Sequence, residues 1–441
     1  MTYFRVFWSF ADAVGLVNML DGLSSILEVL MIYISENHVR PFKVILWSSG
    51  AYIVGLIMLC ISIYIWIPED KAWMYFIPVV FLLAVGESGG LPILKEFLGD
   101  ELKAHEPIQN IDEDRVKARK KVWWLTSQFL CGVLTCFICG YLSTASTFIS
   151  SASLMGIGSL LFLCCIPLFH SSIGLSANEF PLGYCRSDNE AAAREISHMS
   201  PSGNERLVAG EIRIDMPSCV SPTKKPISTV IPMWIAFLVF GLVLSTGDTF
   251  FLEQAYHMGS KESVYLLLLL SNMISCLAKW IPKTHGTKTK GILVEIWIAM
   301  ALSVLCGGVA WCVESRRLNG IIAKYGSCDH RDDGAHMSIL WLGPQFFLLA
   351  LMEAIGKRGL DHFVEMQLTD GRMKKYAKAL NEGVIGFGGF ISGFLVKVLQ
   401  SWFTDYFNCT RLDKYYILLM IVSFVNLCYY CGVWIYYAKK K

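Results

Sequence analysis

Long apolar runs alternate with polar segments along almost the whole chain of 441 residues. Each run approaches the roughly 20 residues that a helix needs to cross a bilayer. Helices are expected because the backbone inside lipid must satisfy its own hydrogen bonds. The pattern predicts eleven membrane helices, at 8–33, 44–67, 72–94, 122–144, 147–170, 228–250, 263–281, 291–314, 338–362, 379–400 and 415–437.

Two polar segments interrupt this pattern. Segment 95–121 carries charges of both signs, whereas 171–227 is long, rich in Ser, Pro, Glu and Arg, and without apolar periodicity. The second segment predicts a flexible linker. We therefore expect an all-α membrane protein with a five-helix bundle at 1–170, a linker at 171–227 and a six-helix bundle at 228–441. Transporters built from repeated halves favour equal halves, so the simplest explanation is a six-plus-six design that lacks its first helix.

Composition agrees with a membrane protein and narrows its chemistry. The chain is 54% hydrophobic and only 17% charged, whereas soluble domains are about 25% charged. A net charge of +2 gives no electrostatic case for nucleic-acid binding. Most cysteines lie inside apolar runs, where they behave as small apolar residues, and none has convincing zinc spacing. We expect no metal and no cofactor, and no motif indicates an enzyme.

Basic residues indicate the orientation. They concentrate in one set of loops, which includes 95–121, 171–227 and the C-terminal end. The positive-inside rule therefore places the linker and the C-terminus in the cytoplasm and the N-terminus outside. Arg317 falls in an outside loop after 291–314. The sequon that begins at Asn408 also falls outside, so Asn408 is a candidate glycosylation site.

Of the ionisable residues inside the apolar runs, four are the natural candidates for chemistry: Glu87, Asp248, Glu353 and Lys357. An ionised side chain near mid-bilayer costs about 2.5–3.5 kcal/mol on insertion scales, so such residues usually face a polar cavity or a partner. They are the candidate solute and proton pathway. Glu353 and Lys357 are four residues apart and can pair on one helix face. This pair either gates the pathway or neutralises itself for insertion, and Lys357 with Arg358 could also attract an anion such as nitrate.

The first two acids have simpler explanations as well. Glu87 precedes Gly89, Gly90 and Pro92, so it is either a proton-binding group or a hydrogen-bonded acid at a helix kink. Asp248 is either part of the pathway or an acid at the membrane boundary.

Four blocks of the chain resemble the plant nitrate transporter/peptide transporter family, within the proton-dependent oligopeptide transporters of the major facilitator superfamily. WLGPQFFLLALMEAIGKRGLDHFVEMQ (341–367) is similar to that family's tenth helix, and DTFFLEQA (248–255) resembles the end of its seventh. AVGESGGLPILKEFLGDEL (84–102) resembles its fourth helix, and ISENHVRPFKVILWSSGAYIVGL (34–56) resembles the loop after its second. The resemblance implies a two-bundle fold and a proton-coupled importer.

The chain departs from the family in its loop motif after the second helix, with Glu36 for the usual Asp and Arg40-Pro41 for Gly-Arg, and more strongly at two other points. The first family helix, whose E-x-x-E-R motif serves proton coupling, has no counterpart. Aligning Pro92, Phe97 and Asp100 with the family pattern places Leu91 where the family has a lysine on its substrate side. Lys95, one turn further on, either replaces that lysine or extends to the cytoplasmic surface.

The expected function is therefore a secondary transporter of a small polar or anionic solute, such as nitrate, a peptide or a related metabolite, with or without protons. The alternative is a transport-deficient or truncated relative that acts as a regulatory or interaction protein. The expected partners are the solute, protons and the lipid bilayer. We expect the plasma membrane as location, with the vacuolar membrane as the alternative; the sequence leaves the oligomeric state open.

Overall fold

The computed structural model describes residue 4 and residues 8–65, 67–104, 113–176, 227–280, 289–326, 337–368, 371–404 and 406–439. Its long helices in the first part of the chain are α1 (Phe10–Asn37), α2 (Pro41–Tyr64), α3 (Glu69–Ala104), α4 (Glu113–Tyr141) and α5 (Thr144–Ser176). The α-helices in the second part are α7 (Ile231–Thr246), the short α8 (Leu252–Met258), α9 (Lys261–Trp280), α10 (Thr289–Tyr325), α11 (Gly343–Gln367), α12 (Gly371–Val398) and α13 (Leu412–Lys439). A π-helical turn, η3 (Gly247–Phe251), joins α7 to α8.

Within these ranges, eleven helices are long and apolar enough to cross a membrane. One of them is the continuous α7–η3–α8 segment, Ile231–Met258. The expected number of helices and the all-α class are therefore confirmed, and the chain is an integral multi-pass membrane protein.

Local sequence explains several helix starts. The Ser9 hydroxyl oxygen accepts a hydrogen bond from the Asp12 amide at 3.3 Å and so caps α1. Proline stands in the first turn of α2, α7 and α11, where its missing amide hydrogen costs no helical hydrogen bond.

Three helices extend well past the apolar runs that predict them, and the helix bounds are corrected accordingly. Helix α3 continues to Ala104 and α4 begins at Glu113, so much of the polar segment 95–121 is helical. Helix α10 continues to Tyr325, and this places Arg317 on a helix rather than in a loop. Hydropathy detects only the part of a helix that lies in lipid, whereas polar turns beyond it are held by contacts with other segments.

The chain divides into two units. The first comprises residues 1–160 and 224–441, and it contains all contacts discussed below. The second comprises 161–223, and its described part is the helical end of α5, up to Ser176. The expected linker at 171–227 thus begins within α5, and its residues 177–226 lie outside the described ranges.

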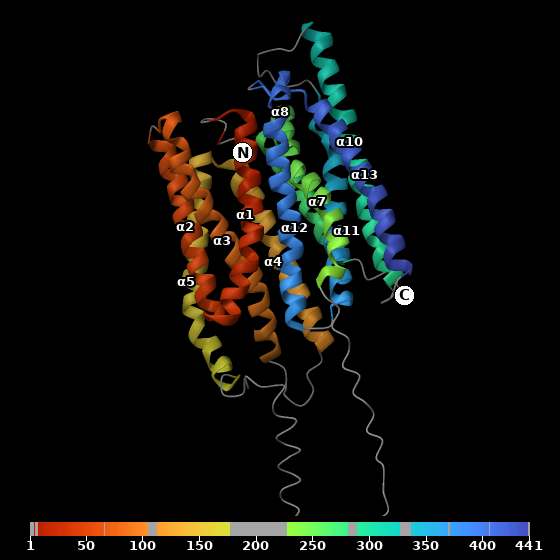
Figure 1. Ribbon diagram of the computed structural model, residues 1–441. Coiled ribbons are helices and arrows are strands. Elements are labelled where there is room, and N and C mark those ends of the chain that lie inside the picture. The colour runs from red at the N-terminus through yellow and green to blue at the C-terminus, as the bar shows by residue number, and fades with distance from the viewer. Residues whose placement is uncertain are drawn as a thin grey trace, which may run out of the picture. The chain divides into compact units, whose positions relative to one another are not determined.

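Helix α1 joins the first helix set (α1–α5) to the second (α7–α13). It lies beside α12, as Figure 1 shows for the red and blue ribbons, and it also packs on α3. Its residues belong to two hydrophobic cores: Phe10 and Val14 join the core of the second set, and Ala13 and Leu16 join that of the first. The helix is therefore anchored on both sides.

Small and polar residues make the contact between α1 and α12 close. A Cβ atom at Gly22 would come within 2.6 Å of the Phe390 ring, so only glycine fits there. The buried Asn18 side chain accepts a hydrogen bond from Ser245 of α7 at 2.7 Å and donates one to Ser392 of α12 at 3.3 Å. These contacts tie α1 to two helices of the second set.

Candidate functional site

Three charged side chains meet between α11 and α12. Lys357 Nζ lies 3.2 Å from Glu353 Oε1, one helical turn earlier, and 3.1 Å from Glu382 Oε2 on α12. The side chains are 31%, 37% and 37% exposed, respectively. Glu353 lies about 15 Å along α11 from its start, at 1.5 Å per residue, which is near the middle of a bilayer core about 30 Å thick. We call these three residues the open triad, because each side chain is about one-third exposed.

Asp248 belongs to the π-helical turn η3. It is the exposed residue in a run that is otherwise buried from Phe240 to Phe251. Asp248 interacts electrostatically with Glu353, Lys357 and Asp21 of α1, so it faces these helices rather than lipid. Single π turns inside α-helices occur frequently at functional sites. We call the surface that carries the open triad, Asp248, Asp21, Glu28 and Glu87 the interior face. The electrostatic contacts of Asp248 favour a place on this face over a position at the membrane boundary.

Glu87 of α3 reaches the same interior face from the first helix set. It is exposed between buried neighbours, interacts electrostatically with Asp21, and lies within hydrogen-bonding reach of Ser24. Helix α3 runs unbroken through Pro92. A side chain at Gly89 would overlap Ser48 of α2, so this glycine permits close packing of the two helices.

Leu91 lies one turn beyond Glu87 and is 56% exposed. Lys95, another turn further, interacts electrostatically with Glu28 of α1 and Asp361 of α11. Its Nζ atom also lies 5.7 Å from the centre of the Trp124 ring. Lys95 therefore places a positive charge one turn beyond Leu91, and this charge faces helices of both sets.

Sequence reasoning missed three acids of this interior face: Asp21, Glu28 and Glu382. Glu28 interacts electrostatically with Glu382 and Lys357 across the boundary between the helix sets. Asp21 and Glu28 are seven residues apart, which is two helical turns, and this spacing could have placed them on one face. Glu382 was hidden because the predicted helix began at 379, whereas α12 begins at Gly371 and places Glu382 about three turns inside.

Arg358, next to Lys357, points elsewhere. Its Nη1 atom donates to the Ala278 carbonyl oxygen at 3.0 Å, and its Nε atom lies 3.8 Å from Glu295 Oε2 on α10. Lys357 is enclosed by two carboxylates. Both cations are therefore already paired with acceptors, which weakens the hypothesis that they attract an anion.

A second charged cluster, the sealed cluster, contains Arg317, Glu314, Gln254, Gln345 and Asn408, all at most 5% exposed. Arg317 donates two hydrogen bonds to Glu314, at 2.8 and 2.7 Å, and one to Asn408 Oδ1 at 3.0 Å. Gln254 donates to Glu314 at 2.7 Å, and Gln345 donates to Gln254 at 3.1 Å. The cluster connects α8, α10, α11 and the short helix η6 (Phe407–Cys409).

Burial of Asn408 counts against the glycosylation hypothesis. The side chain is 5% exposed and accepts the hydrogen bond from Arg317. A glycan on its amide nitrogen would displace this packing, so the folded chain offers no room for the modification.

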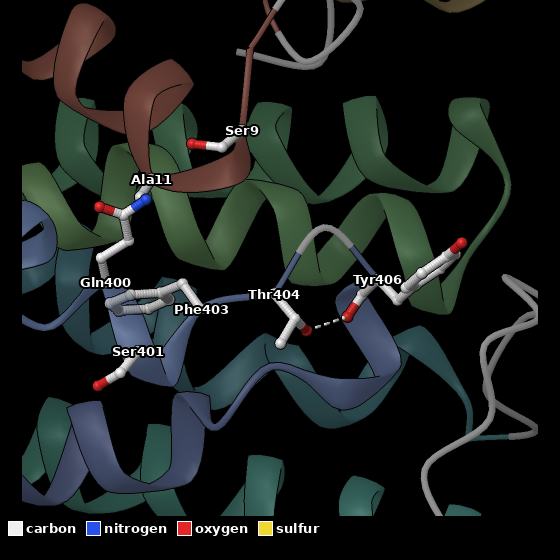
Figure 2. A pocket seen from close by; sticks show the side chains of 7 residues that line it. All are labelled: Ser9, Ala11, Gln400, Ser401, Phe403, Thr404 and Tyr406. Carbon is white, nitrogen blue, oxygen red and sulfur yellow. Dashed lines mark hydrogen bonds between the residues drawn. The ribbon is translucent and has the colours of Figure 1, made fainter.

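One cavity of about 530 Å³ lies where α1 begins. Figure 2 shows its lining, with Thr404 donating a hydrogen bond to the Tyr406 carbonyl oxygen at 2.9 Å. The lining consists of Ser9, Ala11, Gln400, Ser401, Phe403, Thr404 and Tyr406. The cavity includes no member of the interior face, so it carries none of the predicted site residues. Among the described residues, no group of His, Cys, Asp and Glu could hold a metal ion.

Comparison with known proteins finds relatives that match almost the whole chain. The chain is 24% identical to Protein NRT1/ PTR FAMILY 5.10 of Arabidopsis thaliana, over 98% of this chain and 87% of that protein. It is 25% identical to Protein NRT1/ PTR FAMILY 5.12 of the same plant, with the same coverage. The chain is a relative of the NRT1/PTR proteins. Over 48% of the chain and 43% of Protein NRT1/ PTR FAMILY 5.5, also of Arabidopsis thaliana, identity rises to 34%.

Solved structures agree on the fold. A POT family transporter in complex with a thioalcohol conjugated peptide superposes with a TM-score of 0.60 at 11% identity, covering 99% of this chain and 91% of that one. The nucleoside transporter NupG, as its D323A mutant, superposes with a TM-score of 0.59 at 13% identity, covering 98% of this chain and 93% of that one. No protein-family model matches the chain. The chain therefore shares its fold with these transporters.

Proposed function

We propose that the chain is a secondary transporter that moves a small polar solute along the interior face formed by both helix sets. The observation that carries this proposal is the open triad, which keeps three ionisable side chains accessible near the middle of the membrane. Charged groups in that position are costly, so an accessible cluster of them favours a solute or ion site over a purely structural role.

The two helix sets contribute to the face in different ways. The first set supplies Asp21, Glu28 and Glu87, and the second supplies the open triad and Asp248. Electrostatic interactions cross from one set to the other at several of these positions. A site between two helix sets is what alternating access requires, because each set can move relative to the other around the solute.

Proton coupling belongs to the proposal. Carboxylates outnumber lysines on the interior face, and a carboxylate can take up and release a proton as its surroundings change. Glu87 is a candidate for this role on the first helix set, since it is exposed and lies close to another acid, Asp21. Its counterpart on the second set is Glu353.

Orientation and location follow from the loop charges. We infer that the C-terminus is cytoplasmic and that the plasma membrane is the site of action, with the vacuolar membrane as the alternative. The related NRT1/PTR proteins, matched over most of their length, favour the transporter over an interaction protein.

The test is uptake by the full chain in oocytes, with a dipeptide mixture and nitrate offered separately at acidic and neutral outside pH. We expect uptake of at least one solute to be faster at acidic pH. Glu353→Gln should abolish most of that uptake, because it removes a carboxylate of the open triad. Glu87→Gln should abolish the acid stimulation if Glu87 carries the proton.

Glu365→Gln is the matched control. Glu365 lies on the same helix, α11, but its carboxylate pairs with Lys378 at 2.8 Å, away from the open triad. Its uptake should equal that of the unmodified chain. Absence of uptake of every solute, with the protein detected at the cell surface, would refute the transporter proposal. The alternative, a regulatory or interaction protein, would then be favoured.

A further inference from the structure

Lys357 is held in an unusual position for a lysine inside a membrane. Its ammonium group donates to carboxylates from two helices, Glu353 on α11 and Glu382 on α12. The open triad therefore carries one more negative than positive charge. Because an ammonium group has three donors and no acceptor, two carboxylates leave it little capacity for an anionic partner.

The surroundings of the triad add to the negative charge. Asp248 of η3 faces Glu353, and Glu28 of α1 faces Glu382. Lys279 of α9 interacts electrostatically with Glu353, and Lys95 of α3 does so with Glu28. A mobile cation would be attracted to this region, whereas an anion would meet carboxylates from several helices. The position between Glu353 and Glu382 is already filled by the lysine ammonium.

The side chain is also able to move. Lysine carries its charge on a flexible four-carbon stem, so its ammonium group can shift without a change in the backbone. All three members of the triad are partly exposed, so a solute can reach them. Glu382 lies on the neighbouring helix and could retain Lys357 when Glu353 takes another partner.

We propose that Lys357 is a tethered cation that occupies the place of a solute's ammonium group and thereby sets the charge selectivity of the site. A solute with a positive amine binds Glu353 by displacing Lys357, which stays paired with Glu382. Anions without such a group, nitrate included, are excluded. This inference rests on the proposed function because it concerns the same site.

The first experiment measures binding, so that it does not depend on transport. The full chain is purified in detergent, and its melting temperature is recorded against increasing ethylammonium chloride, with N-methylglucamine chloride holding the ionic strength constant. We expect Lys357→Gln to bind ethylammonium at least about tenfold more tightly than the unmodified chain, a change of about 1.4 kcal/mol. Lys378→Gln is the matched control and should leave binding unchanged.

The double variant Lys357→Gln/Glu382→Gln tests whether ethylammonium binding is limited by the lysine that occupies the place beside Glu353 or by the net charge of the triad. It removes one positive and one negative charge, so the triad keeps its charge balance while the place beside Glu353 becomes vacant. If the lysine is a tethered cation, the double variant binds ethylammonium more tightly than the unmodified chain. Equal binding would mean that only net charge matters and would overturn the inference.

The second experiment is uptake of the cationic dipeptide lysylalanine by the same variants in liposomes. The inference predicts a lower KM in Lys357→Gln, whereas a merely destabilised protein would show a lower maximal rate at unchanged KM. Tighter ethylammonium binding without uptake would support the role of Lys357 and count against the transporter proposal. Unchanged ethylammonium binding in Lys357→Gln and in Lys357→Gln/Glu382→Gln would overturn the role of Lys357, whatever the result of the uptake experiment.

Discussion

The sealed cluster around Arg317 and the open triad around Lys357 both place one cation against carboxylate oxygens, but they differ in access to water. Arg317 and Glu314 are almost fully buried, with a two-point contact between the guanidinium and the carboxylate. The members of the open triad are about one-third exposed. One cluster is closed by its neighbours, and the other stays available to a partner.

This difference separates a structural role from a functional one. Buried ions remain stable only when hydrogen bonds satisfy them, and Asn408 and Gln254 provide those bonds in the sealed cluster. In the open triad, water can replace a lost protein partner. Removing a charge should therefore damage folding at the first cluster and solute selectivity at the second.

The largest effect is expected for Arg317→Ala. The substitution leaves Glu314 buried without its cation, and breaking a buried ion pair in this way costs about 3–5 kcal/mol. Denaturant titration of the purified chain in detergent would measure the lost free energy of unfolding. The double variant Arg317→Met/Glu314→Leu should recover much of the loss, since it removes both charges. A loss within experimental error for the single variant would contradict the structural role.

A smaller effect is expected for Asn408→Ala. This variant removes one acceptor from Arg317, and an unsatisfied buried donor costs about 1–3 kcal/mol. The same titration measures it. The unmodified chain produced in a eukaryotic host should show no change in gel mobility after endoglycosidase treatment. A mobility change would mean that Asn408 is accessible during folding and carries a glycan.

A still smaller effect on stability is expected for Lys357→Gln. Its partners are reached by water, so the free energy of unfolding should fall by at most about 1 kcal/mol, the upper value for exposed ion pairs. Solute binding should change far more than stability in this variant. A loss as large as that of Arg317→Ala would show that the open triad is a structural element after all.

The smallest effect is expected for Lys397→Gln. Lys397 Nζ lies 2.5 Å from Asp12 Oδ1 and joins α12 to α1, but the lysine side chain is 56% exposed. Exposed pairs contribute about 0.2–1 kcal/mol, so the change should fall near the lower end. A greater loss of stability than in Lys357→Gln would contradict a ranking of these pairs by access to water.

Local patterns in the sequence were sufficient for the helices and for the pairing of Glu353 with Lys357. Helix number depends on apolar runs, and the pairing depends on spacing along one helix, so both can be predicted from short segments. Glu382 and Arg317 could not be placed in this way. Glu382 lies at the very start of the predicted helix 379–400 but well inside α12, which begins at Gly371. Arg317 lies beyond the run 291–314, on a helix that continues to Tyr325.

The sealed cluster is even harder to predict from short segments of the sequence. Its members come from four separate elements, and only Arg317 and Glu314 are close in sequence. An outside loop was therefore a reasonable expectation for Arg317, and a glycosylation site for Asn408. Only the packing of η6 against α10 brings the two side chains together.

The number of residues in the π-helical turn sets the relative directions of two side chains: Asp248, which lies beside the open triad, and Gln254, which belongs to the sealed cluster. A π turn accommodates one residue more than a regular α-helical turn, and each residue in an α-helix advances the side-chain direction by about 100°. With this extra residue, Asp248 can face the interior while Gln254, six positions later, reaches Glu314. Deletion of one residue between Gly247 and Phe251 would bring the two faces out of phase, so that the helix could serve either cluster but not both.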